Sequence, residues 1–172
     1  MAPAPVDLQN MRRCVEMSRQ AALAGEYPFA AIVAIGRDVI AEVANRAVRD
    51  KDVTHHAELL ALSVAQERLS TKDLSKCSLY TSVEPCVMCS FPIRETRISR
   101  VLFSIQSRLM GGASRWNVLG DSSLSDRMPD YFGKPPEIVA GLLTDEAEAV
   151  WEAWNPEMWR VFRKQGLFGA SP

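Results

Sequence analysis

Two cysteines in the stretch SVEPCVMCS have the types and spacing that suit metal chemistry. Cys86 and Cys89 lie three residues apart, which places their side chains on the same side of a helical turn. Pro85 suits the entrance of such a helix. Exposed amides and the helix dipole there stabilise thiolates and lower the pKa of the thiols. Two thiolates that point the same way provide half of a tetrahedral zinc site.

The other half of this site must come from elsewhere, and the chain has only two histidines, His55 and His56 in VTHHAELLALSVAQ. His56 and Glu58 form an H-x-E pair at the start of an apolar helical stretch. Residues two apart point to opposite sides of a regular helix. The two side chains therefore converge only if His56 occupies the non-helical cap position. His55 is expected in the preceding loop or behind the metal ligands.

Three protein ligands leave the fourth position of a tetrahedral zinc open, which is typical of a catalytic site. Water in that position is easier to deprotonate, and this gives Glu58 a role as proton carrier and not as ligand. Either motif alone is a weak signal, since H-x-E arises by chance. C-x-x-C alone also occurs in redox pairs and structural zinc sites.

The elements that must position these residues alternate between helix and strand. Helices are expected at residues 8–25, 57–69 and 85–96, then at 145–154 with Thr144 as cap and at 156–166 with Asn155 as cap. Pro92 is expected to kink or end the third of them. Strands are expected at residues 29–35, 39–45, 77–83, 100–105 and 137–143, the first two joined by a hairpin turn. Residues 46–53 are expected as a polar loop, and residues 111–130 as an irregular connection with some helix.

This order predicts an α/β fold, a three-layer α-β-α sandwich around a mixed five-stranded sheet. We expect residues 1–172 to form a single domain with a C-terminal helical segment from about residue 144. The formal net charge is −1, and 47% of the residues are hydrophobic. No apolar run is long enough for a membrane span, and the first residues lack a secretory signal pattern. We therefore expect a cytoplasmic protein in which Cys14 and Cys77 are packed thiols.

The pair H-x-E and P-C-x-x-C resembles the signature of the cytidine deaminase-like superfamily of zinc-dependent deaminases. The stretches YPFAAIV, ANRAV, THHAELLAL, LYTSVEPCVMC and RVLFS are most similar to one branch of it. That branch holds bacterial tRNA adenosine deaminases, guanine deaminases and fungal-type cytosine deaminases. The resemblance covers roughly residues 8–107, and GLLTDEAEAVWEAW more loosely.

The resemblance implies one zinc ion per chain, held by His56, Cys86 and Cys89, with Glu58 as the acid and base of a hydrolytic deamination. Glu58 would take a proton from water, pass it to a ring nitrogen and then protonate the leaving amine. For substrate binding the resemblance implies Asn45, the backbone amide of Ala57, Phe29 and, in the irregular connection, Trp116. It also implies a homodimer, for which an apolar face at Val87, Phe91 and Ile93 is available.

The sequence leaves the substrate open. Ser107 stands where the tRNA-editing branch usually has an acidic residue, and SRWNV lacks the carboxylate that the guanine branch tends to place there. We therefore expect a nucleobase, nucleoside or related amino-heterocycle as substrate. The alternative is tRNA adenosine-to-inosine editing, although the only compact basic face is Arg160, Arg163 and Lys164. An alternative of another class is a zinc-containing binding module without turnover, which the presence of Glu58 disfavours.

Overall fold

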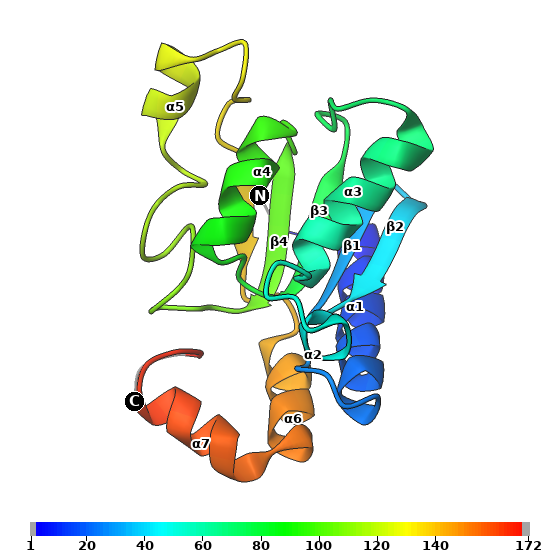
Figure 1. Ribbon diagram of the computed structural model, residues 1–172, viewed down its shortest axis with the longest axis vertical. Coiled ribbons are helices and arrows are strands. Elements are labelled where there is room, and N and C mark those ends of the chain that lie inside the picture. The colour runs from blue at the N-terminus through cyan, green and yellow to red at the C-terminus, as the bar shows by residue number, and fades with distance from the viewer. Residues whose placement is uncertain (1–2, 170–172) are drawn as a thin grey trace.

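The computed structural model describes residues 3–169, which build one sheet with helices on both of its faces (Figure 1). The elements in chain order are α1 (Pro5–Leu23), β1 (Ala30–Ile35), β2 (Asp38–Ala44), α2 (Ala47–Asp50), α3 (Ala57–Leu69), β3 (Ser78–Val83), α4 (Val87–Glu95), β4 (Arg100–Ile105), α5 (Ser122–Arg127), β5 (Glu137–Ala140), α6 (Thr144–Trp154) and α7 (Pro156–Lys164). Among the described residues, no helix combines the length and apolar character that a membrane span needs.

The five strands follow the order β2-β1-β3-β4-β5. β1 pairs antiparallel with β2, to which a two-residue turn at Gly36 and Arg37 joins it, and antiparallel with β3. β3, β4 and β5 run parallel to one another. Parallel neighbours need a crossover connection, and α4 supplies the one between β3 and β4. The predicted mixed five-stranded sheet is confirmed.

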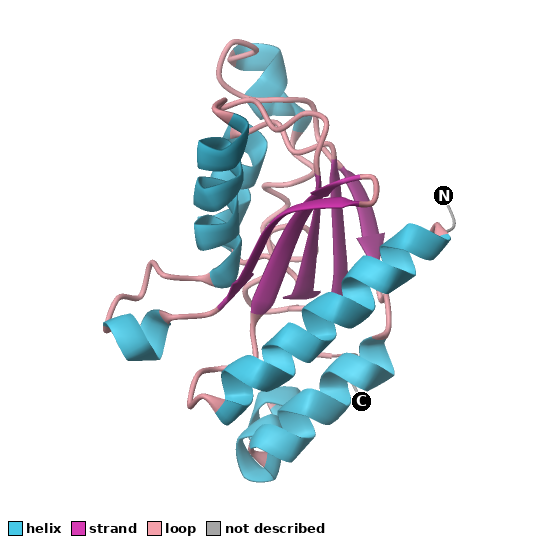
Figure 2. Cartoon of the chain, turned by 90° about the vertical axis from the view of Figure 1, so that its right-hand side faces the viewer, coloured by secondary structure: helices cyan, strands magenta, loops and turns pink. Residues whose placement is uncertain are grey.

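Helices cover both faces of the sheet, so the three-layer arrangement is also confirmed (Figure 2). Successive residues of a strand point to opposite faces, and in β3 both faces are buried. Leu79 packs in one core cluster with Ala61 of α3 and Ile93 of α4. Its neighbour Tyr80 packs in the other cluster with Met11 of α1. The two helices that carry the candidate site residues therefore share one layer.

A third core cluster joins the C-terminal helices to the sheet. Trp151 of α6 is buried at its centre, and the rings of Phe29, Trp159 and Phe168 lie 5.1, 6.0 and 5.0 Å from its ring. Trp151 is therefore a core residue. Phe168 follows α7 in the sequence. Its packing in this cluster therefore brings the end of the described chain back to the sheet.

Several predicted element boundaries need correction. α1 begins at Pro5, three residues before the predicted start, and the short helix α2 lies in the predicted polar loop. β5 ends at Ala140, because Gly141 turns the chain with a φ of +80°. Thr144 is the first residue of α6 and not its cap, since its hydroxyl donates to the carbonyl of Ser104 at 3.0 Å. The cap at Asn155 is confirmed, since its Oδ1 accepts from Met158 N at 3.0 Å.

Pro92 lies inside α4 without ending it. The helix continues to Glu95, and the carbonyl of Pro92 accepts hydrogen bonds from the backbone N–H and the hydroxyl of Thr96 at 2.8 and 2.7 Å. The turn that follows Pro92 is closed by Thr96. Pro92 therefore does not end the helix, and the other effect expected of it, a kink, stays a prediction.

Candidate active site

The predicted chemistry gathers where the N-termini of α3 and α4 lie side by side on one face of the sheet (Figure 1). His56 precedes α3 with an extended backbone, φ −69° and ψ 146°, so the prediction of a non-helical cap position is confirmed. Cys86 holds the same position before α4, with φ −70° and ψ 171°, and Cys89 follows within the first turn. The His56 side chain makes no cap hydrogen bond to α3, so it is free to turn toward α4. The Cys86 Sγ atom contacts Cys89 of its own helix and also faces His56.

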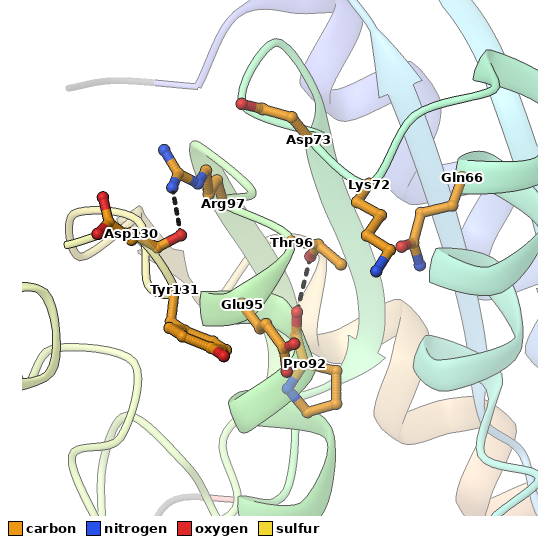
Figure 3. A pocket seen from close by; sticks show the side chains of 9 residues that line it. All are labelled: Gln66, Lys72, Asp73, Pro92, Glu95, Thr96, Arg97, Asp130 and Tyr131. Atoms are coloured by element: carbon orange, nitrogen blue, oxygen red, sulfur yellow. Dashed lines mark hydrogen bonds between the residues drawn. The ribbon is translucent and has the colours of Figure 1, made fainter. Parts of the chain in front are cut away.

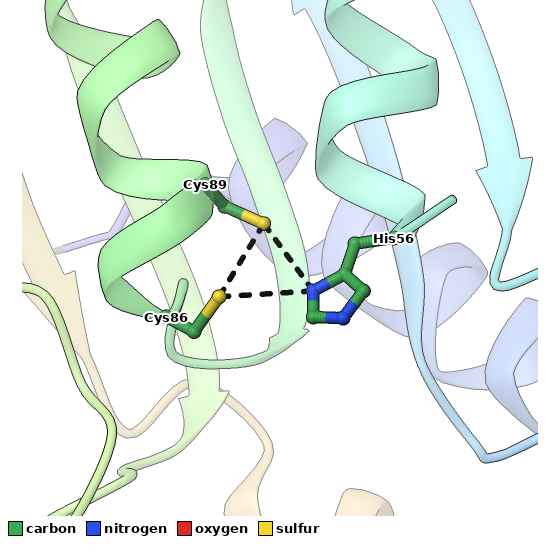
Figure 4. Close-up of side chains that lie close together, drawn as sticks. All are labelled: His56, Cys86 and Cys89. Carbon is green, nitrogen blue, oxygen red and sulfur yellow. Dashed lines mark hydrogen bonds between the residues drawn. The ribbon is translucent and has the colours of Figure 1, made fainter. Parts of the chain in front are cut away.

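Figure 4 shows that the three side chains do turn toward one another. His56 Nδ1 lies 3.7 Å from Cys86 Sγ and 3.5 Å from Cys89 Sγ, and the two sulfur atoms are 3.6 Å apart. A tetrahedral zinc with Zn–S bonds of about 2.3 Å and a Zn–N bond of about 2.0 Å places its ligand atoms about 3.5 to 3.8 Å apart. The three atoms thus fit three corners of a zinc tetrahedron.

Of the three side chains, Cys86 is the one whose electrostatics favour a bound cation. The hydrogen bond from the Cys89 thiol and the adjacent His56 ring lower the pKa of Cys86 to about 4. That hydrogen bond and burial raise the pKa of Cys89. The Cys86 thiolate in turn raises the pKa of His56. The cluster therefore carries a stabilised thiolate, the form in which cysteine binds a metal ion.

Glu58 is buried beside these side chains, with 8% of its surface exposed. Burial, followed by the nearby Cys86 thiolate, raises the pKa of Glu58 to about 7. A carboxyl group with a pKa near neutrality both accepts and releases protons readily, as a general acid and base must. The buried environment of Glu58 therefore suits a proton carrier, whereas a carboxylate on the protein surface would stay charged.

A small pocket opens beside the cluster. His56, Glu58 and Cys86 form one side of it, and the other lining residues are Phe29, Val83, Glu84, Ser107, Met110 and Phe168. Its volume is about 40 Å³, which is space for about one water molecule. Apart from the cluster, most of its lining residues are apolar.

Of the four predicted substrate-binding residues, one lines the pocket and a second lies between the pocket residues His56 and Glu58 in the sequence. Phe29 lines the pocket, and Ala57 is the buried first residue of α3, where a backbone N–H has no partner within the helix. Asn45 is buried outside the pocket lining, and its Nδ2 donates to Glu26 Oε2 at 2.9 Å. Trp116 is 58% exposed and lies beneath the guanidinium of Arg115, 5.2 Å from its ring centroid. The structure thus does not support the prediction that Trp116 lines the pocket.

His55 lies in the loop before α3, as expected. Its Nδ1 is 2.8 Å from Asp50 Oδ2, and its Nε2 is 3.5 Å from Asp52 Oδ2. These contacts tie the loop to α2 and leave the adjacent His56 to face the cysteines. His55 therefore stays outside the cluster of candidate ligands.

Sequence reasoning did not name five residues of the pocket wall as site residues: Val83, Glu84, Ser107, Met110 and Phe168. Glu84 offered a signal, since it lies two residues before Cys86 in SVEPCVMC. Met110 and Phe168 offered none, because they reach the pocket through long connections. Their spacing to the motif residues in the sequence has no regular period.

A larger cavity, of about 640 Å³, lies at the other ends of α3 and α4, where Gln66, Glu95 and Tyr131 are among its lining residues (Figure 3). None of the predicted site residues lines it. Although this cavity is larger than the pocket beside His56, Cys86 and Cys89, it is therefore not the candidate active site.

Comparison with known proteins agrees with this geometry. Residues 5–105 match the family model of the cytidine and deoxycytidylate deaminase zinc-binding region. The tRNA-specific adenosine deaminase of Aquifex aeolicus is 38% identical over 123 residues, covering 70% of this chain and 80% of its own. The probable cytosine deaminase of Schizosaccharomyces pombe is 33% identical over 151 residues, covering 82% and 87%. The structure of the guanine deaminase of Nitrosomonas europaea superposes with a TM-score of 0.69 at 30% identity, covering 91% of this chain and 87% of that one.

Proposed function

The chain belongs to the cytidine and deoxycytidylate deaminase family, a zinc-dependent family, and from this premise we propose that it deaminates a nucleobase, nucleoside or related amino-heterocycle. It is a hydrolase of C–N bonds, so the reaction consumes water and releases ammonia. The observation that carries the proposal is the convergence of His56, Cys86 and Cys89 at tetrahedral spacing, with Glu58 buried in the same pocket. The described chain would act as one deaminase domain.

In this proposal His56, Cys86 and Cys89 hold the zinc and Glu58 moves the protons. Bound zinc makes water easier to deprotonate near neutral pH. Glu58 would accept a proton from the attacking water and deliver it to a ring nitrogen while the hydroxyl adds to the ring carbon. It would then take the proton of the added hydroxyl and pass it to the exocyclic amine, so that the bond between the ring carbon and this amine breaks, a carbonyl remains and ammonia leaves. The pKa of Glu58, about 7, suits both directions of this transfer.

The remaining residues would bind and orient the ring. Phe29 and the N–H at the start of α3 flank the space beside Glu58. Asn45 is proposed as a substrate contact by family resemblance. Glu26 supports a defined orientation for it, because a carboxylate accepts only from the NH₂ side of the Asn45 amide and leaves its oxygen facing away.

Two features favour a small molecule over a polynucleotide. The pocket has no Lys or Arg among its lining residues, and Phe168 adds an apolar ring to its wall, which does not suit a ribose-phosphate chain. The basic residues of α7 also face acidic residues of α6: Arg163 Nη1 lies 3.5 Å from Glu148 Oε2, and Arg160 and Lys164 line the same cavity as Asp145 and Glu152. Phosphate binding needs basic groups that are not already neutralised.

Editing of tRNA is the second candidate, and one observation favours it. The Aquifex aeolicus protein, which is 38% identical over 123 residues, is a tRNA-specific adenosine deaminase. A side-by-side assay separates the two candidates. Ammonia release is measured from amino-purines, amino-pyrimidines, triazines and their nucleosides, and inosine formation is measured in transcribed tRNA. Efficient inosine formation with an inert small-molecule panel would overturn the preferred substrate class.

We also propose a homodimer in the cytoplasm. On α4, Val87, Met88 and Phe91 expose 39%, 37% and 47% of their surfaces and form an apolar patch beside the site. Ile93, which the sequence analysis placed on this face, is instead buried in the core. All four cysteines are free thiols, which fits a reducing compartment.

A further inference from the structure

Glu84 is a buried carboxylate to which the proposed reaction assigns no task. It lies between the end of β3 and Cys86, with 3% of its surface exposed. One oxygen accepts from the backbone N–H groups of Ala113 and Ser114 at 3.0 and 2.7 Å. The other accepts from the N–H of Ser107 and the hydroxyl of Ser114, both at 2.8 Å. A single side chain therefore holds both ends of the segment 107–114.

The segment 107–114 is part of the pocket and contacts the candidate ligands. It carries Ser107 and Met110 of the pocket lining. Its backbone also pairs with the start of α4: Val87 N donates to Met110 O at 3.2 Å, and a β-bridge links Cys86 to Gly111. The position of Cys86 and the position of this pocket wall are thus fixed together.

Two glycines show how closely the segment 107–114 packs against Glu84 and α4. A Cβ atom on Gly111 would lie 2.4 Å from the carbonyl of Ser107 and in severe overlap with the Glu84 carboxylate. A Cβ atom on Gly112 would overlap the hydroxyl of Ser90 in α4. A side chain at either position would force the segment away from β3 and α4.

From these contacts we infer that Glu84 is a positioning residue, which fixes the pocket wall and the metal ligand Cys86 relative to each other by clamping the segment 107–114. This inference rests on the proposed function for the meaning of the pocket. The clamp itself requires a carboxylate, because all four of its partners donate hydrogen bonds. An amide at this position would direct its NH₂ group at two N–H or O–H donors and break one side of the clamp.

The test uses the zinc-loaded protein and two variants of the clamp, with Asp7→Asn as matched control. Asp7 is also a buried carboxylate with several hydrogen bonds, but it belongs to α1, on the opposite face of the sheet. The first readout is the rate of zinc release to an excess chelator. The second is hydrogen exchange at the amides of Ser107, Ala113 and Ser114. Both are measured at a temperature where every variant is folded by circular dichroism.

Glu84→Gln is expected to release zinc at least about tenfold faster than the wild type, as expected when a residue that supports a ligand is changed. It is also expected to lose exchange protection in the segment 107–114. Ser114→Ala, which removes only the hydroxyl bond, is expected to shift both readouts in the same direction by less. Asp7→Asn is expected to lower the melting temperature with zinc release unchanged.

Wild-type zinc release and exchange protection in Glu84→Gln would overturn the inference, and so would equal acceleration in Asp7→Asn. If Glu84→Gln does not fold, the zinc release rate and the hydrogen exchange of Ser114→Ala are measured instead. Wild-type values of both in Ser114→Ala would then overturn the inference. Neither readout needs turnover. An inactive wild-type enzyme on every substrate would therefore contradict the proposed function and leave this test intact.

Discussion

The Nδ1 atom of His56 lies 3.5 Å from the Sγ atom of Cys89, although the two residues are 33 positions apart in the sequence. The contact exists because each residue is placed at the start of its own helix, and α3 and α4 lie in the same layer on the sheet. The metal chemistry of this protein is thus a property of two helix N-termini brought side by side by β3.

The first prediction concerns zinc binding. Cys86→Ala is expected to lose the zinc ion that the wild type holds, because two remaining ligands form an incomplete site. Cys77→Ala removes a buried thiol that lies outside the cluster, and it is expected to keep full zinc. Elemental analysis of both purified variants checks this, and a full zinc complement in Cys86→Ala would refute the ligand assignment.

The second prediction concerns the size of the substrate. Phe168→Ala is expected to enlarge the pocket and to increase the activity on nucleosides relative to free bases, because Phe168 and Glu58 line the same small pocket. Phe162→Ala is the control, since Phe162 packs 5.5 Å from Phe168 in the same aromatic cluster but does not line the pocket. Each truncation costs up to about 3–5 kcal/mol of stability. The ratio of kcat/KM values for a nucleoside and its base is measured, and the same ratio in both variants would reject the role of Phe168.

The third prediction concerns acid stability. Asp7 is fully buried, which alone would raise its pKa, but hydrogen bonds from Arg100, Ala4 N and Tyr80 hold the pKa of this carboxyl below its ordinary value. Its contribution to stability is therefore complete above the unfolded-state pKa, near 4, and is lost as the pH falls through the lower folded-state pKa. Asp7→Asn is expected to cost about 3 kcal/mol at neutral pH.

Urea unfolding of the wild type and Asp7→Asn between neutral and acidic pH tests this expectation. The difference in unfolding free energy between the two proteins should shrink as the pH falls below 4. A difference that stays constant over this range would show that the Asp7 carboxylate charge does not carry the effect.

The fourth prediction concerns assembly. The wild type is expected to be a dimer by light scattering at micromolar concentration, and Phe91→Glu is expected to shift it toward the monomer. A charge placed in the apolar patch of α4 would have to be buried in the interface. Leu23→Glu is the control, because Leu23 is 76% exposed at the end of α1, far from α4 in the fold. A monomeric wild type, or equal dissociation in both variants, would contradict the proposed interface.

Local sequence signals were sufficient to predict the cluster of metal ligands and the mixed sheet. The start of α3 at Ala57 followed from the need for His56 and Glu58 to converge, and the structure has that start. Spacing, caps and hairpin turns act within a few residues, so they can be read from the sequence. The pattern of α and β elements then defined the mixed sheet.

The pocket wall could not be predicted in this way. Phe168 reaches the pocket only because the aromatic cluster around Trp151 folds α7 back, with Gly169 N donating to Gln106 O at 2.9 Å. Trp116 was placed in the pocket from its position in the connection, but that connection is directed by the buried Arg94, which donates to the carbonyls of Val118, Leu119 and Asp121. Such tertiary contacts leave no period in the sequence.

Ammonia release by the wild type and by Glu58→Ala, compared at equal zinc content, tests the central claim most directly. The wild type is expected to release ammonia from at least one amino-purine, amino-pyrimidine, triazine or nucleoside. Glu58→Ala is expected to keep its zinc and its fold and to lose turnover by about 10²- to 10⁴-fold, because the proton carrier is gone while the metal ligands remain. Turnover in Glu58→Ala close to that of the wild type would contradict the proposed mechanism.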